Sequence, residues 1–185
     1  MKLKIALILI LSTWFNKNLF GQYMIGMSTA LDNDMSEWII YPENDSLPEC
    51  RIRARWRLEQ DPTEWDFRMG EISGTLRSKW RNRFDEWEII CDNEIVRVKM
   101  VWPGDWRQWR IESKDGEFQV KALYNMPVSQ LTVSKRDEVL MNIDPSFEND
   151  PRDWIIQDDL PEDAHLSTRM GIFSSVILSL VLRNL

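Results

Sequence analysis

Residues 65–80 read WDFRMGEISGTLRSKW, residues 87–102 read WEIICDNEIVRVKMVW, and residues 109–124 read WRIESKDGEFQVKALY. These units begin 22 residues apart, and each opens with a tryptophan that is followed two positions later by an apolar residue. Each unit also ends on an aromatic residue, at Trp80, Trp102 and Tyr124. A repeat this regular indicates an architecture built from one recurring supersecondary unit.

The repeat extends in both directions from these units. Six pairs of this kind begin 27, 22, 22, 22 and 23 residues apart, and Phe147 stands seven residues before the last pair, as Trp80 stands seven before Trp87. We interpret the tryptophans that open the pairs as architectural because their spacing is nearly constant. The pairs are Trp38 with Ile40, Trp65 with Phe67, Trp87 with Ile89, Trp109 with Ile111, Leu131 with Val133, and Trp154 with Ile156.

Each unit has the pattern of a β-hairpin, with an alternating segment, a polar turn and a second alternating segment. The turns fall at residues 70–71, 92–93 and 114–116. Six hairpins give about twelve short strands with one apolar face. Such a sheet must either fold into a sandwich or close into a barrel.

Strand side chains alternate between two faces, so parity separates an interior face from a solvent face. The solvent face is charged, acidic on the first strand of most hairpins and basic on the second. Closing a hairpin on residues 92–93 places Glu88 opposite Arg97 as a cross-strand ion pair. The residues that parity assigns to the interior are Ile52, Ala54, Trp56, Leu58, Trp65, Phe67, Met69, Leu76, Ser78, Trp80, Trp87, Ile89, Cys91, Val96, Val98, Met100 and Trp102.

The C-terminal segment decides between sandwich and barrel. Residues 170–182, MGIFSSVILSLVL, are apolar on all sides apart from one glycine and three serines, and a helix of that kind is buried on every side. Residues 158–163, DDLPED, have the proline and acidic residues typical of a helix start. We predict a helix over about residues 161–183 inside a closed antiparallel barrel of about twelve strands. The alternative is a membrane helix, but thirteen residues rise only about 20 Å against a hydrocarbon core of about 30 Å.

The N-terminal segment is typical of a secretory signal. Lys2 and Lys4 precede an uninterrupted apolar run over residues 5–11, and neither cysteine lies near the expected cut at residues 21–22. We predict a signal peptide over residues 1–22, a single domain over residues 23–185, and a secreted or periplasmic protein that is not a lipoprotein. The alternative is a frayed N-terminus in a cytosolic protein. Removing residues 1–22 leaves 20 basic against 30 acidic residues, which opposes nucleic-acid binding.

The chain resembles the tubby C-terminal-domain superfamily, which includes the LURP-one-related proteins and the phospholipid scramblases. The resemblance rests on GTLRSKWRNRFDEWEI (residues 74–89), VRVKMVWPGDWRQWRI (residues 96–111) and DWIIQDDLPEDAHLSTRMGIFSSVILSLVL (residues 153–182). It implies a β-barrel around a central C-terminal helix. It also implies that basic side chains on the outer surface of the barrel hold an anionic lipid headgroup, as they do in members that bind phosphoinositides.

The sequence offers little catalytic chemistry. His165 is the single histidine, and its place beside the predicted helix start indicates a structural or capping role, so no Ser-His-Asp triad is expected. The spacing of histidine and cysteine predicts no metal site, and no glycine-rich phosphate loop or other cofactor site is expected. We expect a non-enzymatic, monomeric binding or scaffold domain. The alternative from another class is a hydrolase with a carboxylate pair such as Asp158 and Asp159.

Two candidate binding sites follow from the outer face. Trp106, in a loop beside Pro103 and Gly104, is the tryptophan best placed for exposure and for contact with a glycan, although it matches Phe84 and Val128 in the repeat, which favours packing. The other site is a set of basic residues that we call the basic ladder; it would bind an anionic headgroup unless neighbouring acids neutralise it. The basic ladder consists of Arg77, Lys79, Arg97, Lys99 and Lys121.

Cys50 and Cys91 share the interior parity but lie three strands apart in the predicted register. Three strands span about 14 Å, whereas a disulfide needs α-carbons within about 7 Å. The sequence therefore predicts two free, buried thiols.

Overall fold

A computed structural model describes residues 24–184 of this chain, apart from residues 33, 57–60, 82 and 125–127. The predicted signal peptide, residues 1–22, lies outside the described residues. Among the described helices, none has the length and apolar character that crossing a membrane requires.

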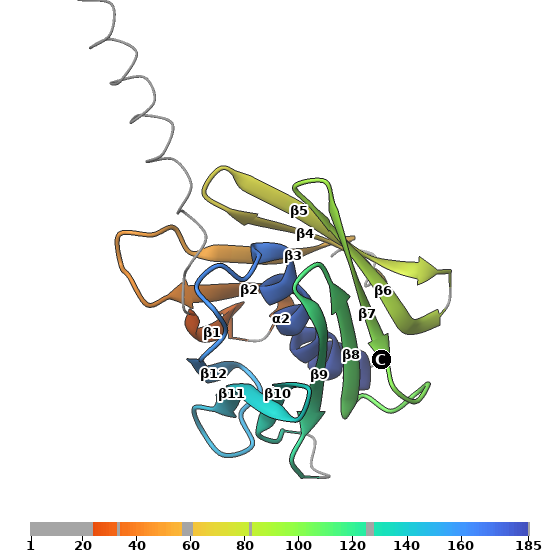
Figure 1. Cartoon of the computed structure of the whole chain (residues 1–185). Coiled ribbons are helices and arrows are strands. Elements are labelled where there is room, and N and C mark those ends of the chain that lie inside the picture. The colour runs from red at the N-terminus through yellow and green to blue at the C-terminus, as the bar shows by residue number, and fades with distance from the viewer. Residues whose placement is uncertain (1–23, 33, 57–60, 82, 125–127, 185) are drawn as a thin grey trace, which may run out of the picture.

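The described residues form a closed antiparallel barrel of twelve strands, as the repeat predicts (Figure 1). Each strand pairs with its neighbours in the chain, and β1 pairs with β12 to close the ring. Glu88 lies opposite Arg97, which confirms the predicted register of that hairpin, but the predicted ion pair is not formed, because Glu88 pairs with Arg77 and Arg97 with Glu112. The strands are β1 (Met24–Leu31), β2 (Asp34–Pro42), β3 (Cys50–Trp56), β4 (Asp61–Met69), β5 (Ile72–Trp80), β6 (Arg83–Cys91), β7 (Glu94–Met100), β8 (Gln108–Ser113), β9 (Gly116–Ala122), β10 (Leu131–Lys135), β11 (Glu138–Pro145) and β12 (Asp153–Asp158).

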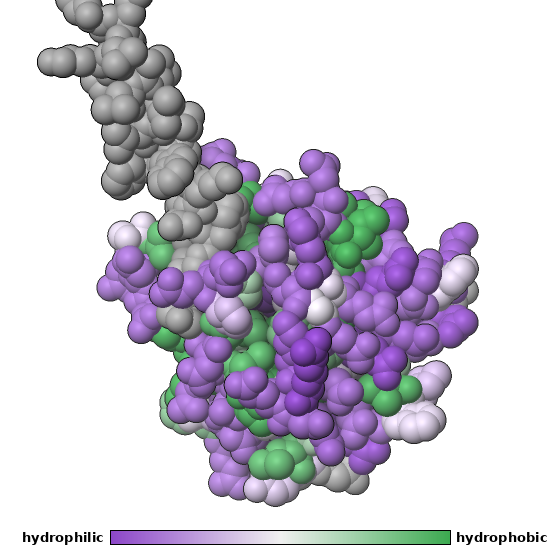
Figure 2. Space-filling model, viewed as in Figure 1, coloured by the Kyte–Doolittle hydropathy of each residue, from purple (hydrophilic) through white to green (hydrophobic). Residues whose placement is uncertain are grey.

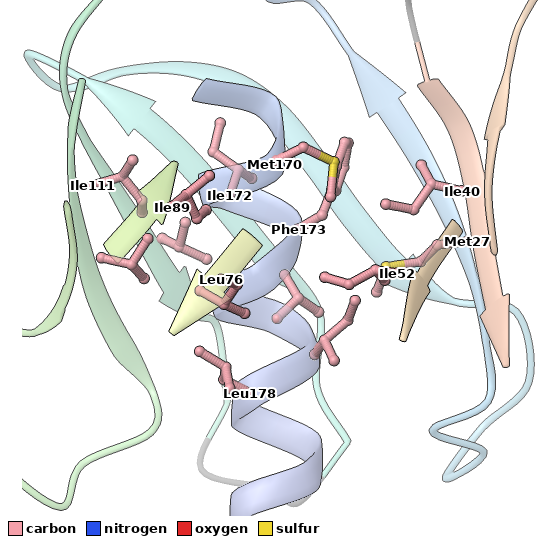
Figure 3. Packing of buried hydrophobic residues seen from close by; sticks show 14 of the residues in the cluster. Met27, Ile40, Ile52, Leu76, Ile89, Ile111, Met170, Ile172, Phe173 and Leu178 are labelled. Carbon is pink, nitrogen blue, oxygen red and sulfur yellow. The ribbon is translucent and has the colours of Figure 1, made fainter. Parts of the chain in front are cut away.

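Helix α2 (Leu166–Val181) lies inside the ring of strands, and a 3₁₀ turn, η2 (Leu182–Asn184), follows it (Figure 1). Figure 3 shows Ile89 beside Ile172 on one side of the helix, and Phe173 projecting toward Ile40 on the other side. Gly171 permits a close approach, because a Cβ there would lie 2.9 Å from a methyl carbon of Ile111. The helix therefore fills the barrel, and the interior is a packed core.

The helix begins later than the sequence pattern predicts. Residues 161–164 form a turn closed by the Ala164 N–H and the Pro161 carbonyl, and the helix starts at Leu166 with His165 as its N-cap residue. No acidic residue lies in the first turn. The carboxylate at this helix end comes from Asp115 in the β8–β9 turn, which accepts the His165 backbone N–H at 2.9 Å. The predicted start was wrong because a residue fifty positions away supplies the cap.

Five buried tryptophans lie on the inner side of the barrel near one end. Each indole N–H donates to the backbone carbonyl three residues earlier, as Trp87 does to Phe84 at 2.8 Å and Trp65 does to Pro62 at 2.8 Å. A large ring is thus buried without leaving its polar atom unpaired. The same bond recurs at Trp38, Trp109 and Trp154.

Both cysteines are free and buried, as predicted. Burial raises the pKa of the Cys50 thiol to about 12 and that of the Cys91 thiol to about 11. Because only the thiolate is nucleophilic, we expect neither residue to react with iodoacetamide at about pH 8 in the folded protein. Both should react in concentrated urea without a reductant, and intact mass spectrometry would count the additions. Failure to alkylate the unfolded chain would contradict the free-thiol assignment.

Candidate binding surface

The basic ladder lies on the outer face of the sheet, where acidic residues of the neighbouring strands neutralise most of it. Arg77 pairs with Glu88 at 3.1 Å, and Lys79 pairs with Glu86 at 2.5 Å. Arg97 approaches a carboxylate less closely, because 3.9 Å separates it from Glu112. Figure 2 shows the resulting outer surface as mainly hydrophilic.

Two members of the basic ladder have no such pairing. Within the described part of the chain, no carboxylate lies within ion-pair distance of Lys99 or Lys121. Lys99 sits opposite Glu86 on one side, without a close contact, and opposite Arg110 on the other, whereas Lys121 sits opposite Gln108 and Thr132. The ladder thus offers two separated ammonium groups rather than a continuous cationic strip.

Trp106 is half-buried rather than exposed, and it packs against the core. Its ring centroid lies 6.1 Å from that of Trp109, and its backbone carbonyl accepts both the Trp109 indole N–H and the Ser179 hydroxyl. Its match with Phe84 and Val128 in the repeat, which favoured packing, therefore predicted its position better than its place in a loop did.

The tryptophans at or just beyond the strand ends are exposed, contrary to the prediction from parity. Trp56, Trp80 and Trp102 are 43%, 49% and 65% exposed. At Trp56 and Trp80 the register shifts just before the residue, because the facing strand, β4 or β6, has two extra residues there. Such an irregularity bends the strand pair and disrupts the ladder at the end of the barrel. Parity was wrong at these positions because the regular pairing on which alternation depends ends there.

These tryptophans belong to a larger set that we call the aromatic rim. Each member stands at the end of one hairpin or in the connection to the next. In an antiparallel barrel these connections all lie at one end, opposite the end where α2 begins. Among the described residues, every large aromatic residue that is exposed belongs to the set. The aromatic rim consists of Trp56, Trp80, Trp102, Tyr124 and Phe147.

The members of the aromatic rim are held in place by local contacts. The Trp56 and Trp80 indole N–H groups each donate at 3.3 Å to a glutamate of the next strand, Glu64 and Glu86. Lys79 Nζ lies 5.4 Å from the centre of the Trp80 ring. The hydrogen bond from Lys79 has the largest effect on the pKa of Glu86. Together with the hydrogen bond from Trp80 it outweighs burial and lowers that pKa. The glutamate therefore stays ionised beside the ring.

Two of the connections repeat one turn. The Trp102 carbonyl accepts the Asp105 N–H at 2.9 Å, and the Phe147 carbonyl accepts the Asp150 N–H at 3.1 Å. In both turns an arginine two residues after the aspartate forms two side-chain hydrogen bonds with it, as Arg107 does with Asp105. The rim thus alternates aromatic rings with neutralised charge pairs.

Sequence reasoning assigned part of the aromatic rim to the wrong face, although one signal marked it. A residue seven positions before the opening residue of a pair is apolar in all six units and aromatic in four of them, and Trp56 stands nine before Trp65. An aspartate four residues before the buried tryptophan marks the turn between the exposed aromatic residue and that tryptophan, as Asp105 and Asp150 do. The combination of an outer aromatic, a turn and an inner tryptophan was the missed motif.

A cluster at the opposite end of the barrel holds the start of α2. The Asp115 carboxylate accepts the Thr168 hydroxyl at 2.6 Å and lies 2.6 Å from His165 Nδ1. Burial alone would raise the pKa of Asp115, but hydrogen bonds from Thr168 and His165 outweigh it and hold the pKa below its usual range. This arrangement satisfies the free N–H groups of a helix end.

Glu94 completes that cluster from β7. It accepts the Ser167 hydroxyl and the Lys114 ammonium, each at 2.8 Å. The serine is buried and is bonded to the carboxylate rather than to His165, so these residues do not form a nucleophile–base pair. No group of residues suited to a metal ion occurs in the described residues. The cluster is a helix cap, in agreement with the structural role expected for His165.

The repeat is imperfect at Leu131, which stands where other units have a tryptophan. A cavity of about 10 Å³ lies beside it, lined in part by Ser129, Trp154 and Arg183. That volume holds about one water molecule. The cavity is thus a packing irregularity rather than a ligand pocket.

Comparison with known proteins assigns no family. No protein-family model, no curated protein and no solved structure matches the chain. The aromatic rim is therefore the strongest candidate surface on geometric grounds, and the basic ladder is the second.

Proposed function

We propose that this protein is a non-enzymatic binding domain of the cell envelope that holds its ligand on the aromatic rim. The observation that supports the proposal is the recurrence of an exposed aromatic residue at equivalent positions of successive hairpins. A single exposed apolar residue needs no explanation, but a regular set at one end of a molecule does.

Aromatic side chains suit such a role for physical reasons. They offer a large contact area and have only two side-chain torsions, so they lose little conformational entropy on binding. The register shifts and turns at the rim fix the backbone from which the rings project. A pre-organised surface loses less free energy to ordering when the ligand binds.

Anionic lipid binding by the basic ladder is the second candidate, and it follows from the proposed kinship with the tubby-like superfamily. The barrel around a central helix supports that kinship. Lys99 and Lys121 are the residues that support the lipid hypothesis, because they lack a carboxylate partner among the described residues. The ion pairs of Arg77 and Lys79 weigh against it.

A sedimentation assay with envelope fragments of the producing organism tests the proposal. The rim variant is Trp80→Ala/Trp102→Ala/Tyr124→Ala, and its matched control is the ladder variant Lys99→Ala/Lys121→Ala. We expect the rim variant to bind at least tenfold more weakly, because losing interface aromatics commonly costs 2 kcal/mol or more and about 1.4 kcal/mol is tenfold. The ladder variant should bind as the wild type does.

Circular dichroism and urea unfolding establish that both variants are folded. If the ladder variant loses binding while the rim variant keeps it, the headgroup hypothesis replaces the proposal. If neither substitution changes sedimentation, the aromatic rim is not the binding surface.

A further inference from the structure

We infer that the ligand of the aromatic rim is an extended, uncharged, β-linked polysaccharide. The inference rests on the proposed function and deepens it by naming the chemical class of the ligand. Three observations carry it: the spacing of the rings, the groups between the rings, and the charge of the molecule.

The members of the aromatic rim recur at every second strand in the order of the barrel. Consecutive members of the aromatic rim belong to consecutive hairpins, so they are separated by two strands. Two strands span about 10 Å at about 4.8 Å for each step. That distance is close to the length of two sugar rings in an extended β-linked chain. A polymer following the rim could therefore stack every second sugar on an aromatic residue.

The groups between the rings suit hydroxyls better than ions. Arg55 bonds Glu64 and Asp66 beside Trp56, and Arg152 bonds Asp150 beside Phe147. The negative charge of a carboxylate paired in this way is largely balanced by the arginine, so the pair attracts ions only weakly. The remaining lone pairs of the carboxylate can still accept hydrogen bonds. Alternating rings and hydrogen-bonding pairs match the alternating apolar faces and hydroxyl edges of a sugar polymer.

The charge of the molecule disfavours the other ligands that aromatic residues bind. The chain has a net charge of −7, which opposes approach to anionic membranes and to polyanions. At Trp56 and Trp80, the bond from the indole N–H to a glutamate keeps each ring beside a charged group. Insertion into a bilayer would also require these carboxylates to be desolvated.

Isothermal titration with cello- and chito-oligosaccharides of two, four and six sugars tests the inference. We expect affinity to rise at least tenfold for each added pair of sugars in one of these series, because each pair engages one more ring. Trp102→Ala should abolish one such increment, since it removes the middle ring of the set. Val139→Ala, which truncates an exposed apolar residue at the opposite end of the barrel, is the matched control and should leave every increment unchanged.

The same proteins are also tested on cellulose, chitin and other insoluble β-glucans, and on vesicles of phosphatidylcholine alone or with phosphatidylglycerol. Binding to vesicles that requires the aromatic rim, without glycan binding, overturns the inference in favour of a membrane ligand. Absence of binding to every β-linked glycan also overturns it. In both cases rim-dependent sedimentation with envelope fragments would leave the proposed function standing, whereas rim-independent sedimentation would refute that function.

Discussion

Arg169→Met is expected to lower the free energy of unfolding by about 3–5 kcal/mol, because it leaves a buried carboxylate without its counter-ion. The side chains of Arg169 and Asp158 are 1% and 0% exposed, and they form an ion pair inside the barrel. Asp158 also accepts the backbone N–H groups of Met24 and Leu160. One carboxylate therefore joins the start of β1, the end of β12 and the helix. Urea unfolding followed by circular dichroism measures the change.

Two controls separate the buried charge from the loss of a long side chain. Arg77→Met removes an exposed ion pair with Glu88 and should cost less than about 1 kcal/mol. The double variant Asp158→Asn/Arg169→Met removes both buried charges and should recover part of the loss. If Arg169→Met costs no more than Arg77→Met, the buried pair does not stabilise the closure of the barrel.

The barrel could be predicted from the sequence because its information is local and periodic. Trp87, Ile89 and Cys91 alternate with charged or half-buried residues, and all three are buried as period-two alternation requires. The central helix could be predicted because residues 170–182 have no polar face on which to meet water. These features depend on residue type and spacing alone.

The parts that failed depend on non-local contacts or on local irregularity. The start of α2 depends on Asp115, which the turn of the β8–β9 hairpin places beside the helix. Trp80 is exposed where the register with β6 shifts, and nothing in an alternating pattern marks a shift of that kind.

The candidate sites also divide into a part that the periodic pattern predicts and a part that depends on local irregularity. The basic ladder follows from parity. Glu88 pairs with Arg77 rather than with the predicted Arg97, but in either pairing an acidic strand lies beside a basic one. Most of the ladder is neutralised for that same reason. The aromatic rim was hidden because Trp80 and Trp87 are the same residue type, yet the first lies beyond a register shift and is exposed, whereas the second lies in regular pairing and is buried.

That contrast yields the last prediction, in which two tryptophans seven residues apart have opposite roles. Trp87 is fully buried, donates its indole N–H to the Phe84 carbonyl, and stacks on Phe84 with ring centroids 6.2 Å apart. Trp87→Ala is expected to cost about 3–5 kcal/mol of unfolding free energy, because it removes a large buried ring and leaves a cavity. Trp80→Ala should cost less than about 1 kcal/mol, since it removes one exposed ring and a cation–π contact.

Urea unfolding of both variants measures the two costs, and the sedimentation assay measures their effect on binding. We expect Trp80→Ala to weaken binding at nearly unchanged stability. Trp87→Ala should lower the free energy of unfolding. In the absence of urea, the folded variant should bind as the wild type does, because the Trp87 ring does not reach the surface. Equal costs of unfolding, or weakened binding in folded Trp87→Ala alone, would contradict the division of the tryptophans into an inner set that builds the barrel and an outer set that binds.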